Sequence, residues 1–392
     1  MSGFADNDAG GITTYSLAGA QFGYGLMWSL LATMLALGVT QEVGARLGVA
    51  TGQGLAGLIR ERFGVRWTGF AVLVMLAANL GTTVAEFAGI AAALSLFGVA
   101  PQLSSVLAAA FVVILLARGN FGRVQYAFVA VGLAVSVAYA ISAILARPDW
   151  EHAAVATVLP ELQGGSVYLL TLVGVVGTTI TPWGQAFIQS YVADKGLGPK
   201  DLAAERVDVG LGSLLTNVVA AFIVVACAAT IWTQGGSIND AADAARALGP
   251  LAGSNASLLF ATGLLAASLL GLGVVPLTSA YFACEAFGWE SGVHWRWREA
   301  PVFYGLLTFF VGFSALFIVI PGLPLIQVLF VTQVFNGLLL PVILAFVMLI
   351  SGDRRRLGAL AGGRVLQLLG WGVTFLVSLL SVVFVASQIL SR

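Results

Sequence analysis

Eleven apolar stretches of membrane-spanning character constrain this 392-residue chain more than any other feature of its sequence. Hydrophobic residues make up 59% of the chain and charged residues only 9%, against roughly 25% charged in soluble domains. A helix needs about 20 apolar residues to cross a bilayer. The stretches are 12–22 (half-length), 24–44, 67–97, 101–118, 122–146, 166–193, 207–232, 256–287, 301–320, 324–350 and 365–390. We therefore expect one all-α integral membrane domain over residues 1–392, with no separate soluble domain. We also expect a short amphipathic surface helix from Ala50 to Gly64, and the longest loops at 147–165 and 233–255.

The basic residues divide between alternate connections of these stretches. Of the 18 lysines and arginines, only Arg147, Arg246 and Arg392 fall on the side opposite to the rest. Because basic residues concentrate on the cytoplasmic side of membrane proteins, we expect the N-terminus in the cytoplasm and the C-terminus outside. The expected location is the plasma membrane or the bacterial inner membrane, with several passes through the lipid bilayer. The 18 acidic residues balance the basic ones, so a nucleic-acid partner is not expected, and no obligate protein partner is implied.

A polar, glycine-rich segment lies directly before the first stretch, at residues 6–11. A carboxylate is costly in hydrocarbon, so an acid at membrane depth indicates a functional site. Glycines beside it let the backbone leave helical geometry and offer carbonyl groups to a ligand. We expect Asp8 to bind a cation with help from Gly11, and Asp6 and Asn7 to lie nearby. Only seven residues precede Asp8, so the first helix is expected to be truncated.

A second interruption lies in the sixth stretch, at residues 177–185 around Pro182. Proline removes a backbone donor and bends or breaks a helix, although a plain kink remains the alternative. Breaks in stretches one and six are typical of two inverted five-helix repeats whose discontinuous helices meet at the membrane midplane. We expect repeat one at about 1–146, repeat two at about 166–350 and an added helix at 365–390. Thr181 is the expected ligand from this break, with Ile180 and Trp183 beside it.

Other polar residues lie within the apolar stretches. Glu86 is either functional or held by an interhelical hydrogen bond, since a charged residue there does not face lipid. Gln333 is expected to face the ion, and Asn336 lies one turn away, where polar contacts between helices are the alternative. Glu285 is interpreted as structural. The stretches contain no nucleophile–base pair and no histidine cluster, so the chain is not expected to be an enzyme.

At the two breaks the chain resembles the NRAMP family of divalent metal transporters, and the match is collinear over most of the sequence. The matching segments are Asp8 to Gly11 with Ala18 to Tyr24, Leu47 to Gly52, Leu58 to Phe63, Ala85 to Phe87, Thr181 to Trp183 and Thr332 to Val334. The resemblance implies the LeuT-type fold, in which two inverted five-helix repeats are followed here by an eleventh helix. It also implies metal-site roles for Asp8 and Gln333.

The departures from the family pattern concern residues that bind metal or protons. The family's asparagine is replaced by Gly11, its methionine by Thr181 and its histidine by Trp183. The third-stretch aspartate implicated in proton transfer aligns with Thr83, and a further histidine aligns with Ile188. This set of substitutions resembles the NRAMP-related magnesium transporters.

The chemistry of the expected site favours a hard cation. A thioether prefers transition metals, whereas Thr181 offers only oxygen. Magnesium binds through one or two carboxylates and keeps several waters. We therefore expect a secondary transporter of Mg²⁺, with Mn²⁺ as a second substrate, that works by alternating access without proton coupling. The ion is the cargo, and no cofactor is expected. The alternatives are a proton-coupled Mn²⁺ or Fe²⁺ importer and, in another class, an amino-acid permease on the same fold.

Overall fold

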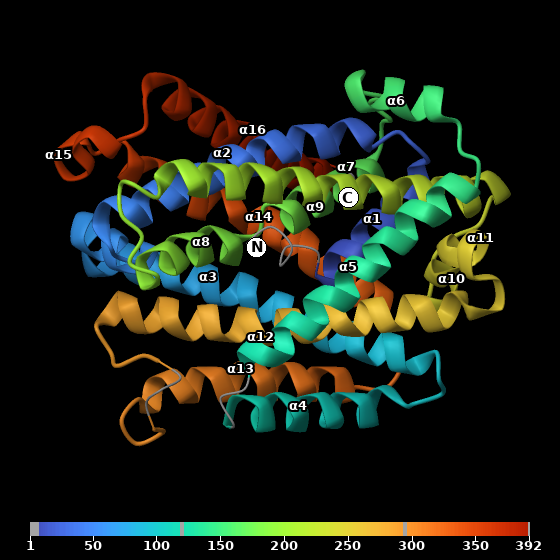
Figure 1. The fold of residues 1–392 in the computed structure, drawn as a ribbon, viewed down its shortest axis with the longest axis horizontal. Coiled ribbons are helices and arrows are strands. Elements are labelled where there is room, and N and C mark those ends of the chain that lie inside the picture. The colour runs from blue at the N-terminus through green and yellow to red at the C-terminus, as the bar shows by residue number, and fades with distance from the viewer. Residues whose placement is uncertain (1–7, 118–120, 293–295, 391–392) are drawn as a thin grey trace.

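The computed structural model describes residues 8–117, 121–292 and 296–390, and these residues form a bundle of helices (Figure 1). Within these ranges, eight helices are long and apolar enough to cross a membrane. The longer helices are α1 (Ala9–Phe22), α2 (Met27–Thr51), α3 (Leu55–Ser95), α4 (Pro101–Ala117), α5 (Phe121–Leu145), α7 (Ser166–Thr179), α8 (Pro182–Asp194), α9 (Leu202–Thr230), α12 (Ala256–Phe287), α13 (Pro301–Val319), α14 (Leu325–Ser351) and α16 (Arg364–Leu390). The all-α prediction is therefore confirmed.

Each of the eleven stretches predicted from the sequence contains a helix, although the boundaries differ. The expected short surface helix at 50–64 is the first part of α3, which Gly64 interrupts with a left-handed backbone (φ 77°). The two longest connections are more ordered than expected. The first contains α6 (Trp150–Val158), and the second contains α10 (Ala241–Ala245) and α11 (Gly249–Ala252).

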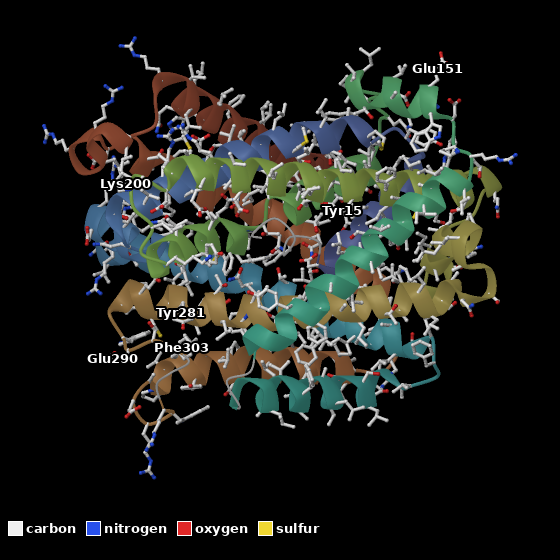
Figure 2. The ribbon with its side chains drawn as sticks, viewed as in Figure 1. Tyr15, Glu151, Lys200, Tyr281, Glu290 and Phe303 are labelled. Atoms are coloured by element: carbon white, nitrogen blue, oxygen red, sulfur yellow. The ribbon has the colours of Figure 1, made fainter. Side chains whose placement is uncertain are left out.

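The long helices lie side by side, and the short ones lie at the two ends of the bundle. In Figure 1, α6, α10 and α11 gather at one end, and α15 (Arg354–Leu357) lies at the opposite end. Figure 2 shows Lys200 and Glu290 at the α15 end, Glu151 at the α6 end and Tyr15 near the centre. We call the α15 end the basic end, because the α8–α9 connection with Lys195 and Lys200 and the arginines of α15 lie there.

Two long helices, α3 and α12, pack antiparallel through the middle of the bundle. Asn79 Nδ2 of α3 donates to Ser279 Oγ of α12 at 2.8 Å. Further along, Glu86 of α3 lies directly against Gly271 of α12. Between these two contacts the residue number increases along α3 and decreases along α12, so the contacts define the antiparallel register of the two helices. Helix α1 packs mainly on α9, α7 and α14 and also touches α3 and α12, and its residues from Ala9 to Ala20 are all buried.

Candidate functional site

The helix α1 begins in the interior of the bundle, immediately after Asp8. The Asp8 side chain is 3% exposed and caps α1, because its Oδ1 accepts a hydrogen bond from Gly11 N at 2.6 Å. Its other oxygen, Oδ2, is buried without a hydrogen-bond partner among the described residues. Buried polar atoms are almost always paired in proteins. The N-terminus of α1 therefore presents a carboxylate oxygen that is available to a ligand.

The predicted break in the sixth stretch separates α7 from α8. Helix α7 ends at Thr179, Ile180 leaves helical geometry, and α8 starts at Pro182. Thr181 caps α8, its Oγ1 accepting a hydrogen bond from Gly184 N at 3.2 Å. The last carbonyl groups of a helix have no partner within it, and proline offers no N–H to replace one. The break therefore supplies oxygen atoms, and α1 meets it where Tyr15 Oη and Thr179 Oγ1 lie 2.8 Å apart.

The side chains of α14 approach the start of α1 from another direction. The Gln333 amide lies against Gly10, and a Cβ at that position would overlap it. Asn336 Nδ2 donates to Gln333 Oε1 at 3.1 Å and to Thr82 Oγ1 of α3 at 2.9 Å. Gln333 Nε2 and Asn336 Oδ1 have no partner in the part of the chain that the structure describes. These hydrogen bonds connect α14 to α3, and the packing of Gln333 on Gly10 places them beside the start of α1.

The Glu86 side chain lies on the α3 side of the same cluster. It is fully buried, and no described side chain forms a hydrogen bond with either of its carboxyl oxygens, although the backbone N–H of Ala9 lies beside it. Its carboxyl group packs against Gly271 of α12, and Gly89, one turn further along α3, lies against Ala9 next to Asp8, so the two acids share one buried region. Two like charges in a dry interior are costly unless a cation or a proton neutralises them. The site therefore holds two acids that need a positive partner.

The threonine at position 178 belongs to this cluster, although sequence reasoning did not single it out. A Cβ on Gly11 would lie 3.2 Å from Thr178 Oγ1 and 3.3 Å from Asp8 Oδ1. Thr178 Oγ1 is buried without a partner in the described ranges, whereas Thr179 Oγ1 donates to Val175 O at 2.7 Å. A signal was present in the sequence, because Thr178 lies in the glycine- and proline-rich break, but adjacent threonines could not be told apart without the helix geometry.

The structure places Asp8, Gly11, Glu86, Gln333 and Asn336 around the start of α1, and their role in binding an ion stays a prediction. It gives the other expected residues different surroundings. Ile180 packs in an apolar cluster of α2, α7, α14 and α16, and Trp183 packs on Val274 and Val275 of α12. Thr181 keeps its cap bond to Gly184, so its role as a ligand stays a prediction. Asp6 and Asn7 lie outside the described residues. No three histidine, cysteine, aspartate or glutamate side chains of the described ranges are grouped to hold a metal.

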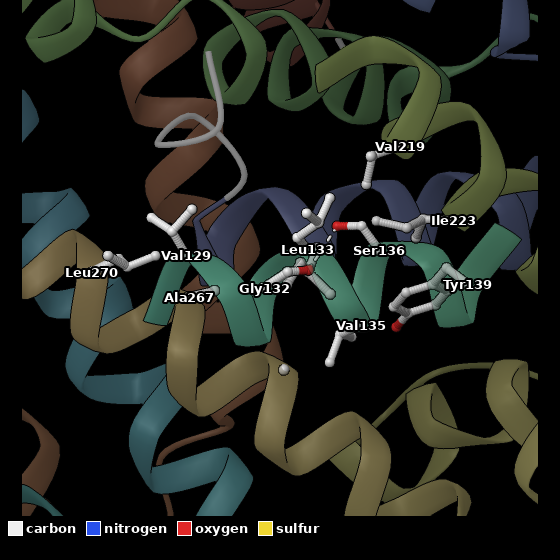
Figure 3. A pocket seen from close by; sticks show the side chains of 12 residues that line it. Val129, Gly132, Leu133, Val135, Ser136, Tyr139, Val219, Ile223, Ala267 and Leu270 are labelled. Carbon is white, nitrogen blue, oxygen red and sulfur yellow. Dashed lines mark hydrogen bonds between the residues drawn. The ribbon is translucent and has the colours of Figure 1, made fainter. Parts of the chain in front are cut away.

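A separate hollow lies beside the first turn of α1, between α5, α9 and α12 (Figure 3). It is lined by Ile12, Val129, Gly132, Leu133, Val135, Ser136, Tyr139, Val219, Ile223, Gly263, Ala267 and Leu270. The Ser136 hydroxyl is bonded to the carbonyl of Gly132 at 2.9 Å. These lining residues carry no charge.

Comparisons with known proteins agree on one family. A family model described as natural resistance-associated macrophage protein-like (Nramp) matches residues 1–387. A protein of Deinococcus radiodurans named divalent metal cation transporter MntH is 29% identical over 391 residues, covering 96% of this chain and 86% of that protein. A protein of the same name from Ralstonia nicotianae is 30% identical over 378 residues, covering 93% of this chain and 84% of the relative.

Solved structures show the same fold. The Eremococcus coleocola manganese transporter superposes with a TM-score of 0.78 at 20% identity, covering 99% of this chain and 85% of that one. Mhp1, a nucleobase-cation-symport-1 family transporter, superposes with a TM-score of 0.59 at 16% identity over 98% of this chain and 91% of its own. The predicted LeuT-type fold is confirmed. The expected closeness to magnesium transporters is not supported, because these relatives are named for divalent metals or manganese.

Proposed function

Because the chain belongs to the natural resistance-associated macrophage protein-like (Nramp) family, we propose that it carries divalent metal ions across a cell membrane by alternating access, with Mn²⁺ as a principal substrate. The observation that carries the proposal is Asp8 Oδ2, a buried carboxylate oxygen without a partner among described residues, at the start of a helix inside the bundle. The relatives named for divalent cations and manganese support the choice of ion.

The donor atoms at the site explain why a small, hard cation fits. The residues around Asp8 are Thr178, Gln333, Asn336 and Glu86, so the side chains supply oxygen and amide groups and no sulfur. Oxygen donors suit Mg²⁺, Ca²⁺ and Mn²⁺, whereas thioether and thiolate donors select softer metals. Mn²⁺ and Mg²⁺ both satisfy this criterion. Mg²⁺ is therefore proposed as a second substrate, and its only support is that the side chains around Asp8 offer no sulfur donor.

Glu86 supports proton coupling as part of the proposal, in place of the uncoupled transport expected from the sequence. Its carboxyl group has no side-chain partner among the described residues and lies in the same buried region as Asp8. A divalent cation at Asp8 satisfies this negative pair when the site is loaded, and a proton satisfies it when the site is empty. Such an exchange couples metal to proton movement without a histidine.

The orientation and repeat boundaries proposed for the chain follow the sequence pattern. The basic end of the bundle is placed in the cytoplasm, since basic connections favour that side. The N-terminus then lies inside and the C-terminus outside. Residues 1–146 and 166–350 form the two repeats, and α16 is the added helix.

Uptake into liposomes by the purified protein tests the proposed function. We expect the wild type to accumulate Mn²⁺ and Asp8→Asn to accumulate none, because the substitution keeps the shape of the side chain and removes its charge. Mg²⁺, Fe²⁺ and leucine are compared under the same conditions. Leucine uptake without metal uptake would favour the amino-acid permease, and uptake of Mn²⁺ by Asp8→Asn at the wild-type rate would overturn the site.

A further inference from the structure

A seam of buried polar side chains runs from the break between α7 and α8 toward the basic end of the bundle. On α8, Thr181, Gln185 and Gln189 are four residues apart and therefore share one face. All three are buried, at 0–1% exposure. Neither amide atom of Gln185 and only one of Gln189 has a hydrogen-bond partner in the described part of the chain. Unpaired buried amides are rare in proteins, so this face of α8 calls for an explanation.

The neighbouring helices α3 and α12 also carry polar side chains between the Asp8 cluster and the basic end. Asn79 lies seven residues, or about 10 Å, from Glu86 along α3. Its Oδ1 is buried without a partner among described residues, although its Nδ2 donates to Ser279 of α12. Glu285 lies fourteen residues beyond Gly271 on α12, or roughly 21 Å from the level of Glu86. The seam thus reaches from the Asp8 cluster to Glu285, near the end of α12.

Three segments meet at Glu285. Ser190 Oγ of α8 donates to Glu285 Oε1 at a long 3.4 Å, and Oε2 has no partner within the described ranges. The turn between α2 and α3 covers the carboxylate, since a Cβ on Gly54 would overlap it. The same turn receives Gln189, whose Nε2 donates to Gln53 O at 3.0 Å. Gln189 Oε1 remains free beside this junction.

The basic groups nearby do not neutralise Glu285. No ion pair to this carboxylate is formed by the residues that the structure describes. Arg60 follows the α2–α3 turn by a few residues in the sequence. Its Nη1 donates to the carbonyl of Ala286 at 3.1 Å and not to Glu285. That bond caps the C-terminus of α12, where cations are stabilised by the helix dipole. Glu285 is therefore half-buried, with its Oε2 atom buried and available to a ligand.

We propose that Glu285, with Gln189 and Ser190, forms a second cation site through which the metal ion passes between the Asp8 cluster and the basic end. This inference rests on the proposed transport function. The lysines and arginines of the basic end repel a divalent cation, and a carboxylate on the route offsets that repulsion. The site has one carboxylate and neutral oxygen donors, so it holds the ion more weakly than the Asp8 cluster with its two acids. Weak binding suits a site that the ion must leave during transport.

Transport and binding measured on the same variants test this site. In liposomes, Glu285→Gln is expected to lower the maximal rate of Mn²⁺ uptake at least about fivefold, while the dissociation constant at the Asp8 cluster changes less than about twofold. Glu285→Asp keeps the charge and is expected to restore part of the rate. Glu290→Gln removes an exposed acid at the same end of the molecule and should leave uptake unchanged.

A pair of glycine variants tests the site without removing the charge of Glu285. Gly54→Ala places a methyl group against the Glu285 carboxylate, whereas a Cβ on Gly57 is 3.6 Å from its nearest neighbour, an ordinary contact. Gly54 has an extended backbone (φ −74°, ψ 165°) that alanine also adopts. We therefore expect Gly54→Ala to slow uptake as Glu285→Gln does, and Gly57→Ala to behave as the wild type.

Crystals soaked in Mn²⁺ give the direct evidence. Anomalous density is expected at the Glu285 carboxylate in the wild type and in Asp8→Asn, and it should be absent in Glu285→Gln. Density at Asp8 alone, combined with wild-type uptake by Glu285→Gln, would overturn the second site and leave the proposed function standing. Absence of uptake by the wild type would instead overturn the proposed function, and the second site as part of a transport route with it.

Discussion

The side-chain amide of Gln333 lies against the Cα of Gly10 so closely that the first turn of α1 has no room for a side chain at this position. Gln333 is itself held by Asn336, which also donates to Thr82 of α3. A movement of α14 relative to α3 would therefore change the position of Gln333 over the start of α1. This contact links helix movement to the geometry around Asp8.

Gly10→Ala is predicted to disrupt ion binding without removing any ligand. The added methyl group would displace the Gln333 amide from the start of α1. A site held about 1 Å out of place commonly loses its function, so we expect Mn²⁺ affinity to fall on the order of tenfold. Calorimetry with Mn²⁺ measures the change. Gly69→Ala is the control, because a Cβ there meets nothing within 4 Å, and equal affinities for the two variants would contradict the prediction.

Thr178 and Thr181 are predicted to have different roles. Thr178→Val keeps the shape of the side chain and removes an unpartnered hydroxyl beside Asp8, so the KM for Mn²⁺ should rise about tenfold, equivalent to roughly 1.4 kcal/mol. Thr181→Val removes the cap of α8 and should lower the free energy of unfolding by about 1 kcal/mol with less effect on KM. Uptake kinetics and thermal unfolding of both variants measure these effects; the reverse pattern would make Thr181 the ligand.

The fold could be predicted from the sequence because each feature that defines it lies within one continuous segment of the chain. The apolar stretches and the helix breaks at Asp8 and Pro182 are visible without contacts, and each stretch contains a helix. Boundaries were less accurate where backbone geometry decided them. The surface helix expected at 50–64 continues into α3, because only Gly64 separates the two parts.

The site was predicted less completely, because its residues meet through tertiary packing. Asp8, Glu86 and Gln333 were identified as charged or polar groups in apolar surroundings. Thr178 was missed, because sequence does not show which of two adjacent threonines bonds to its own helix. The polarity of Glu285 was recognised, but the burial of its unpartnered Oε2 depends on the α2–α3 turn, which lies far away in the sequence.

The pairing of α7 with α14 is predicted to depend on close backbone contact. A Cβ on Gly177 would overlap the carbonyl oxygen of Gln333 and the backbone of Gly337. Added side-chain volume in a packed interior costs typically about 1–3 kcal/mol, and backbone atoms cannot move aside as side chains do. Gly177→Ala should therefore unfold at a lower temperature in detergent than the wild type. Gly312→Ala, where a Cβ meets nothing within 4 Å, serves as the control, and matching melting temperatures would refute the close contact.

Glu86 is predicted to couple metal movement to proton movement. Its carboxyl group is fully buried near Asp8 and has no side-chain partner in the described ranges, so a cation at the site or a proton would stabilise it. A pH-sensitive dye trapped in liposomes should respond when Mn²⁺ enters through the wild type. Glu86→Gln keeps the size of the side chain and removes its titration, so Mn²⁺ entry should continue while the dye response disappears. Glu151→Gln, an exposed acid at the α6 end, should leave both signals unchanged. Mn²⁺ entry through the wild type with no dye response would instead establish uncoupled transport, driven by the ion gradient and the membrane potential.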